Sequence, residues 1–421
     1  MMKSHNSSLV WGVLDSLVVC LNLSNPYTVL PCILFTPHIG LNSSIICVIT
    51  SLYLYIRTKG RIKFSRDLLF LLFILINTYN IFNCLREGNL GLGFVALFFA
   101  STIFYLLLYN IYQIARKHSD FSEALNSVTA GYRLLSFYSL GLVLFMLILI
   151  ELVHVNPLQN EISGTLDILE DNSLRSKYYF PYHLSLIMYG QDLFRLPFFH
   201  EFGTILGLFH EPHTMTYYIV PFFFLMFLTV KKKKWIFMLI AAFVIYMLVA
   251  ASTTNIVCFL MCLGVLLCLK SRVGTVVIAV AAILIIPYIM DNPVFELVFA
   301  KMESGSMTYS SDVLTYALTP KTLLGSNFYD RSYLYEAHPK TDVGYVIFFL
   351  NVAFVSLLTL RTVRLCIKGK DYLYIGLFAL YFTMHSAKVA LNTYSLEILM
   401  MVIFVVSISL KESSLLIANE K

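Results

Sequence analysis

Residues 195–220 read RLPFFHEFGTILGLFHEPHTMTYYIV, and they lie where a polar stretch meets the start of an apolar one. The first 19 of these residues contain one Arg, two Glu and three His, although only 13% of the whole chain is charged. Ionisable groups beside a membrane span cost desolvation energy, so a cluster of them indicates a function. This stretch is therefore the first half of a candidate site.

The surrounding chain has the composition of a membrane protein. Of its 421 residues 58% are hydrophobic, and the mean hydropathy is +0.77. A soluble protein cannot hide that much apolar surface in one core. Repeated apolar runs of about 17–22 residues predict an all-α polytopic integral membrane protein with about 12 transmembrane helices. The net charge of +6 comes from short basic clusters between the runs, which argues against nucleic acid as a partner.

Two long polar stretches divide the apolar runs. Loops of roughly 50–60 residues are far longer than neighbouring helices need, and such loops usually carry function. The predicted organisation is an N-terminal bundle at 1–154, a large loop at 155–213, central helices at 214–290, a second loop at 291–343, and C-terminal helices with a tail at 344–421.

The basic residues predict the orientation in the membrane. On this segmentation one side holds 21 of the 30 Lys and Arg residues, whereas the two long loops and the 85–90 turn hold 8. Lys388 is left within a span. Because the basic side of a membrane protein faces the cytoplasm, we expect both termini inside and both long loops outside.

The second loop ends like the first. Residues 324–345 read LGSNFYDRSYLYEAHPKTDVGY and carry Arg, His and acidic residues just before an apolar run. We expect the two charged segments to meet over one cavity on the outer side.

An outward-facing enzyme has no ATP, so group transfer there needs an already activated donor. Polyprenyl pyrophosphates are membrane donors of that kind. Breaking a sugar–phosphate bond builds negative charge on the pyrophosphate, and the bidentate, permanently charged guanidinium of Arg suits it. The candidates are Arg195 and Arg331, with Lys340 third. The alternatives are that Arg195 anchors to lipid headgroups and that Arg331 is a solvated loop charge.

The attacking sugar hydroxyl needs a base or a hydrogen-bond acceptor. A half-buried carboxylate or imidazole can serve, and the candidates are Glu211, His210, His338 and Asp342. Glu211 could instead complement the dipole of the following helix, and His338 and Asp342 could be loop and cap residues. Two further residues shape the site: Gly207 permits close backbone approach, and Pro212 suits a first helical turn.

Metal binding is the competing use of these residues. His210 and His213 are spaced i, i+3, but Pro212 between them disfavours a regular ligand helix. We expect neither a metal nor another cofactor.

Charged residues also lie inside the predicted spans. Lys388 and Glu397 flank a short turn, and we expect them to pair, with His385 nearby. The alternative for them, and for Asp15 in the first span, is a proton or ion path.

The chain resembles the Wzy-type polymerases, within the O-antigen polymerase and ligase group. One element is Arg195 followed by LGLFHEP at 206–212, which is similar to the Arg, Gly, hydrophobe and Glu-Pro that close the family's large outer loop. The other is LGSN at 324–327 with TDVGY at 341–345, which is similar to the family's Gly-rich turn and its Asp-x-Gly-Tyr element.

This resemblance implies a metal-independent, GT-C-like integral-membrane glycosyltransferase. It would polymerise undecaprenyl-pyrophosphate-linked oligosaccharide repeat units into O-antigen or capsular polysaccharide by en bloc transfer. The resemblance also implies a bacterial inner membrane, an active face toward the periplasm and a chain-length regulator as membrane partner. An O-antigen ligase and a flippase for lipid-linked oligosaccharides stay open as alternatives.

Overall fold

The computed structural model describes residues 2–25, 28–36, 39–86, 92–153, 160–161, 176–179, 186–189, 204–209, 212–230, 232–250, 253–270, 272–273, 276, 280, 318–325, 344–368, 371–386 and 396–419. The chain forms two compact units, each described here by itself. The first unit combines Met1–Asp67, Leu92–Ser252 and Tyr394–Lys421, and the second combines Leu68–Gly91 with Thr253–Thr393.

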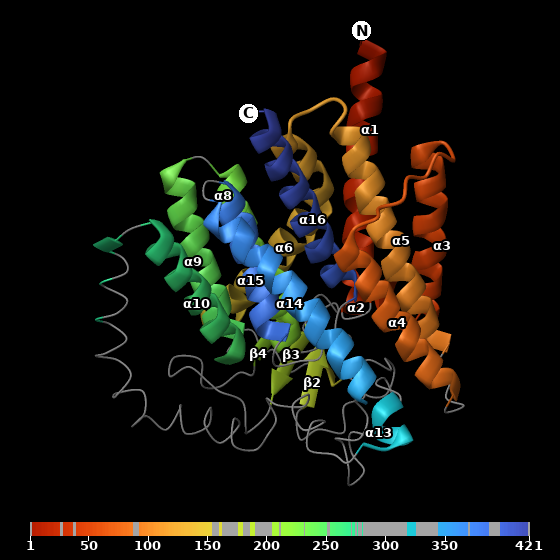
Figure 1. Ribbon diagram of the computed structural model, residues 1–421. Helices are drawn as coiled ribbons and strands as arrows, with labels where there is room; N and C mark the ends of the chain where they lie inside the picture. Colours follow the sequence, from red (N-terminus) through yellow and green to blue (C-terminus); the bar gives the residue numbers. More distant parts are fainter. Residues whose placement is uncertain are drawn as a thin grey trace. The chain divides into compact units, whose positions relative to one another are not determined.

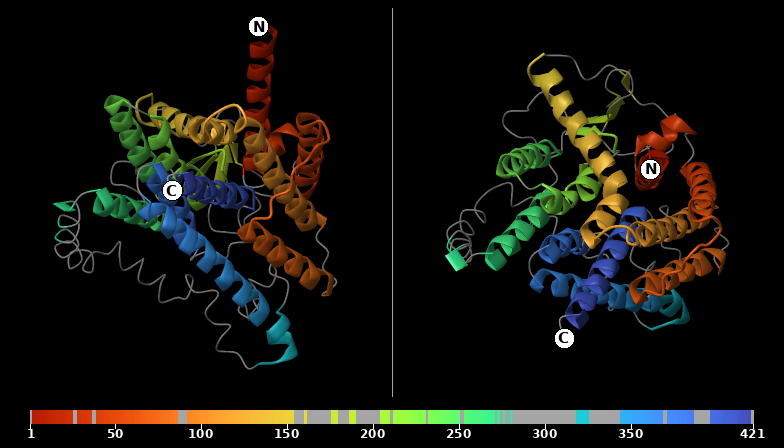
Figure 2. Two further views of the ribbon diagram at one scale, coloured as in Figure 1. Left: turned by 45° about the horizontal axis from the view of Figure 1, so that its top comes forward. Right: turned by 90° about the horizontal axis from the view of Figure 1, so that it is seen from above.

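The first unit contains most of the helices. Its helix α3 packs on α5, α5 packs on α16 and α6, and α1 packs on α6 (Figures 1 and 2). The helices of this unit are α1 (Met2–Ser24), α2 (Val29–Leu34), α3 (Ile39–Thr58), α5 (Leu92–Ala115), α6 (Phe121–Glu151), α7 (Pro212–Ile219), α8 (Phe222–Thr229), α9 (Lys233–Ala250) and α16 (Leu396–Asn419).

The second unit is smaller. In it α14 packs against α4 and α15, and α10 packs against α15. Helices α14 and α15 approach closely because Gly376 has no side chain, and a β-carbon there would lie 2.6 Å from the sulfur of Cys366. The helices are α4 (Leu68–Arg86), α10 (Thr253–Lys270), α13 (Pro320–Leu324), α14 (Tyr345–Ile367) and α15 (Asp371–Ser386).

Helix lengths and composition confirm a membrane protein. Among the described residues, five helices are long and apolar enough to cross a bilayer, and six shorter apolar helices accompany them. Large apolar side chains such as Leu9, Phe237 and Ile367 point outward from their helices, as expected for surfaces in contact with lipid. The five candidate spans are Gly40–Thr58, Val95–Ala115, Phe121–Ile150, Tyr345–Ile367 and Leu396–Leu415.

Two helix boundaries are set by single residues. Helix α6 begins after Asp120, whose side chain accepts a hydrogen bond from the Glu123 amide and so caps the helix. The apolar stretch after Pro212 is divided into α7 and α8 at Pro221, which has no amide hydrogen for a helical bond.

The described part of the chain is mostly helical, and it includes four short strands in the first large loop. They are β1 (Asn160–Glu161), β2 (Ser176–Tyr179), β3 (Leu186–Tyr189) and β4 (Thr204–Gly207), paired antiparallel in the order β1-β2-β3-β4. Outside this small sheet the described elements are helices, which is consistent with the expected all-α membrane protein. In the first unit the sheet lies at the end opposite the two termini (Figure 1), which agrees with termini and large loop on opposite sides.

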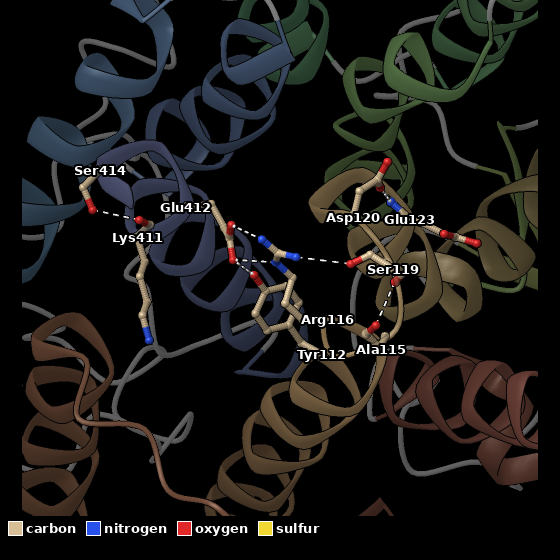
Figure 3. Close-up of polar contacts among 9 residues, drawn as sticks. All are labelled: Tyr112, Ala115, Arg116, Ser119, Asp120, Glu123, Lys411, Glu412 and Ser414. Atoms are coloured by element: carbon tan, nitrogen blue, oxygen red, sulfur yellow. Dashed lines mark hydrogen bonds and ion pairs between the residues drawn. The ribbon is translucent and has the colours of Figure 1, made fainter. Parts of the chain in front are cut away.

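The end of the first unit that carries the termini is held by an ion pair between α5 and α16. The guanidinium Nε of Arg116 lies 3.0 Å from Glu412 Oε1, and the Tyr112 hydroxyl donates to the same carboxylate (Figure 3). The hydrogen bond to Glu412 raises the pKa of Arg116, which therefore stays charged. Because the Arg116 side chain is 42% exposed, this pair contributes at most about 1 kcal/mol to stability.

Candidate functional site

Gly207 ends β4 and packs directly on α6. Its φ angle is +61°, a left-handed conformation that side chains with a β-carbon rarely adopt. A β-carbon at this position would lie 3.3 Å from Cγ2 of Val143 and 3.7 Å from the hydroxyl of Ser139. Gly207 therefore packs against side chains of α6, and its predicted role in the site stays a prediction.

The chain after Gly207 is anchored at Phe209. The Phe209 amide donates to the Leu206 carbonyl at 3.2 Å, closing a tight turn. Phe209 also forms an antiparallel bridge with Thr28, and its ring centroid lies 5.4 Å from that of Tyr218 on α7. All four residues are buried, so the backbone is held firmly one residue before His210.

Helix α7 begins at Pro212, as its suitability for a first helical turn predicted. Its buried face rests on α6 and α9, where the hydroxyl of Tyr132 donates to the Tyr218 carbonyl and the hydroxyl of Tyr246 to the Met215 carbonyl at 3.5 Å. The Thr214 hydroxyl is buried and has no hydrogen-bond partner within the described part of the chain. Thr214 is therefore a further candidate for binding that the sequence pattern did not single out.

The two motifs of the second loop meet at their glycines. Gly325 has a φ angle of +73°, and a β-carbon on Gly344 would lie 2.2 Å from the Gly325 nitrogen and 2.4 Å from its Cα. Only glycine at 344 permits this contact between two backbones. Gly325 and Gly344, the two residues that bound the segment 326–343, are therefore in contact. We call this contact the neck of the second unit.

Helix α4 holds the neck through three side chains. The Tyr79 hydroxyl and the Asn83 amide both donate to the Leu324 carbonyl, at 2.8 and 3.2 Å. The Arg86 guanidinium donates to the Gly325 carbonyl. Arg86 was not predicted as a site residue. Its only signal in the sequence is its position as the one basic residue of the outer 85–90 turn.

The other predicted residues lie outside the described residues. In the first loop these are Arg195, His210 and Glu211. In the second loop they are Arg331, His338, Lys340 and Asp342. The two loops belong to different units, so their meeting over one cavity stays a prediction.

The predicted pair of Lys388 and Glu397 also remains a prediction, because Lys388 is not among the described residues. Glu397 is fully buried in the first unit and accepts a hydrogen bond from Asn25. Asp15 is buried as well and pairs with Arg57 at 3.0 Å. Asp15 and Glu397 thus each have a partner from another segment of the chain.

The turn at Gly207 and the neck at Gly325 and Gly344 each directly adjoin a charged segment of the sequence. Catalysis by positioned side chains requires a well-packed base of this kind. Within the described residues, no group of three or more His, Cys, Asp or Glu side chains could hold a metal ion. In comparisons with known proteins, no family model, no curated protein and no solved structure matches the chain.

Proposed function

We propose that this protein polymerises undecaprenyl-pyrophosphate-linked oligosaccharide repeat units at the periplasmic face of a bacterial inner membrane. The observation that carries the proposal is the contact between Gly325 and Gly344. It joins LGSN and TDVGY, the two separated parts of the second element in the resemblance to Wzy-type polymerases. Gly207 and Pro212, the structural residues of the first element, add support because they form the turn expected of them.

The depth of the first turn suits a lipid-linked substrate. Helices α7 and α8 extend from Pro212 to Thr229, where the basic run Lys231 to Lys234 follows. The two helices and the turn between them form an apolar stretch of about the number of residues that a membrane span needs. With the basic run in the cytoplasm, we place the start of α7 near the outer headgroup level, where the pyrophosphate of the donor lies.

The proposed reaction breaks the bond between C1 of the donor's first sugar and the pyrophosphate oxygen, which leaves with the bonding electrons. A hydroxyl of the acceptor's terminal sugar forms the new bond to C1, and its proton passes to Glu211, His210, His338 or Asp342. Arg195, Arg331 and Lys340 neutralise the leaving undecaprenyl pyrophosphate. The growing chain thereby moves en bloc, without a metal or cofactor.

About 12 spans, a GT-C-like arrangement and a chain-length regulator as partner belong to the same proposal. The alternatives are an O-antigen ligase and a flippase.

The deciding test is the polysaccharide ladder of a strain that lacks the gene. A single repeat unit on the lipid core indicates a polymerase, because ligation continues. Loss of all repeat units with accumulation of lipid-linked units indicates a ligase or flippase, and a normal ladder refutes all three.

Variants distinguish surface chemistry from transport. Arg195→Ala and Arg331→Ala should abolish long chains, whereas Arg175→Ala in the same first loop is the matched control and should retain them. If Arg195→Ala leaves the ladder unchanged while Lys388→Ala removes surface sugar, the in-span charge is the functional one and the transporter alternative is favoured.

A further inference from the structure

Glu397 is the most unusual buried polar residue of the first unit. It lies in the first turn of α16 with a fully buried side chain. Its Oε1 accepts a hydrogen bond from Asn25 Nδ2 at 3.4 Å, and its Oε2 has no partner among the described residues. A carboxyl group in apolar surroundings is costly to bury, so its presence needs a reason other than stability.

Asn25 connects this carboxyl group to two other helices. It follows the last residue of α1, and its Oδ1 accepts a hydrogen bond from the hydroxyl of Ser43 on α3 at 3.3 Å. Asn25 is fully buried and Ser43 almost so. One amide side chain therefore ties α1 and α3 to the start of α16.

The same corner of the chain supports the candidate turn. Thr28 donates to the Ser24 carbonyl through its amide at 3.1 Å and through its hydroxyl at 2.7 Å. It then pairs with Phe209, which directly precedes His210 and Glu211. Glu397 is thus linked to Asn25 by a hydrogen bond, and Ser24, the chain neighbour of Asn25, is linked through Thr28 to Phe209.

Other polar contacts between α1 and α3 do not lead to the turn. Asp15 bonds Arg57 and Asn22 bonds Thr50, at 3.0 and 2.9 Å. These contacts recur every seven residues along both antiparallel helices, a spacing typical of helix pairs held together in a membrane. The Glu397 contact adds a third helix, α16, at the end of this polar stripe nearest the turn.

We propose that Glu397 is a positioning residue for the reaction. Through Asn25, its neighbour Ser24 and Thr28 it holds the backbone at Phe209, the residue that directly precedes the candidate bases His210 and Glu211. This inference rests on the proposed function. Its Oε1 acts as a hydrogen-bond acceptor, so glutamine at this position serves as well as glutamate.

The experiment measures polymerisation by the purified full-length protein over a range of lipid-linked donor concentrations. For Glu397→Leu the expected kcat is lower by about 10- to 100-fold with KM unchanged, because misplacement acts on the transition state. For Glu397→Gln the expected kcat is within about threefold of the wild-type value. Glu412→Leu, at the other end of the same helix, is the matched control with unchanged kcat and KM.

A second measurement does not depend on the activity. In a His210→Cys protein, the rate of labelling by a membrane-impermeant maleimide reports the turn itself, with the chain lacking that substitution as background. Adding Glu397→Leu should change the rate at least about fivefold, and adding Glu412→Leu should not. If the wild type makes no polymer, the proposed function fails, and the labelling still decides whether Glu397 controls the turn.

Three results overturn the proposal. One is an active Glu397→Leu protein with unchanged labelling. Another is a folded Glu397→Gln protein as inactive as Glu397→Leu, which would show that the carboxyl acts through its proton. The third concerns Asn25→Ala, which breaks the same contact and replaces Glu397→Leu if that variant fails to reach the membrane. A wild-type kcat with unchanged labelling for Asn25→Ala would overturn the proposal.

Discussion

Gly344 faces Gly325 so closely that a β-carbon on Gly344 would lie 2.2 Å from the Gly325 nitrogen. The two residues bound the segment that carries Arg331, His338, Lys340 and Asp342. Segments whose ends are fixed lose less entropy when they order around a ligand. If the proposed function holds, this contact lowers the entropy that the second loop loses on binding.

Replacing Gly344 by alanine should open this neck. The φ angle of −67° at Gly344 suits alanine, so the penalty is steric alone. Forcing the two backbones apart should cost about 1–3 kcal/mol and abolish long polysaccharide chains. The measurements are the polymer ladder and the thermal unfolding of the purified protein.

The control for this variant is Gly141→Ala. Gly141 lies within α6 and has no atom within 4 Å of a β-carbon, so alanine should be tolerated there with an unchanged ladder. If Gly344→Ala also polymerises normally at an unchanged unfolding temperature, the neck has no functional importance.

The sequence predicted those parts of the site that depend on local backbone chemistry. Gly207 and Pro212 behave as expected because a left-handed turn and a first helical turn follow from the residue types themselves. The contact between Glu397 and Asn25 joins positions 372 residues apart, and no local pattern reports such a distance. Proximity in sequence instead favoured Lys388 as the partner of Glu397.

The small sheet was also missed, for a different reason. Strands β2 and β3 have only four residues each, and they lie in a stretch that reads as polar overall. Aromatic and branched residues such as Tyr178 and Ile187 favour strands, but a signal this short is weaker than that of an apolar span. The membrane helices, in contrast, can be predicted from the length and composition of their apolar runs.

Gly207→Ala should impair activity through both conformation and space. The left-handed backbone costs alanine about 1–2 kcal/mol, and the new β-carbon presses on Val143 Cγ2 at 3.3 Å. Adding Val143→Ala removes the steric part but not the conformational part. The double variant should therefore recover some stability and some long-chain polymer compared with Gly207→Ala alone. Equal ladders and unfolding temperatures for the two would contradict the packing of Gly207 on α6.

The pair of Asp15 and Arg57 should stabilise the first unit without acting in the reaction. Arg57 bonds both oxygens of Asp15, and the Tyr53 hydroxyl donates to the same carboxylate at 2.6 Å. Removing one charge leaves the other unpaired, so Asp15→Leu or Arg57→Leu should each cost about 3–5 kcal/mol.

The double variant Asp15→Leu with Arg57→Leu tests this directly. It buries neither charge and should cost clearly less than either single change. Thermal unfolding and yield in the membrane measure the difference. A strictly additive loss would show that the two side chains do not interact, and a changed chain length at normal yield would assign the pair a role in the reaction.

The Leu324 carbonyl offers a last test, because it accepts hydrogen bonds from both Tyr79 and Asn83. Tyr79→Phe leaves the Asn83 bond in place and should cost about 0.5–1.5 kcal/mol, as should Asn83→Ala. Losing both donors leaves the carbonyl unsatisfied, so the double variant should cost more than the sum of the two singles. Polymer length should follow the same order, since the neck that opens is the one that holds Arg331. Additive unfolding free energies would mean that the two donors hold the neck independently, and an undiminished ladder in the double variant would separate the neck from polymerisation.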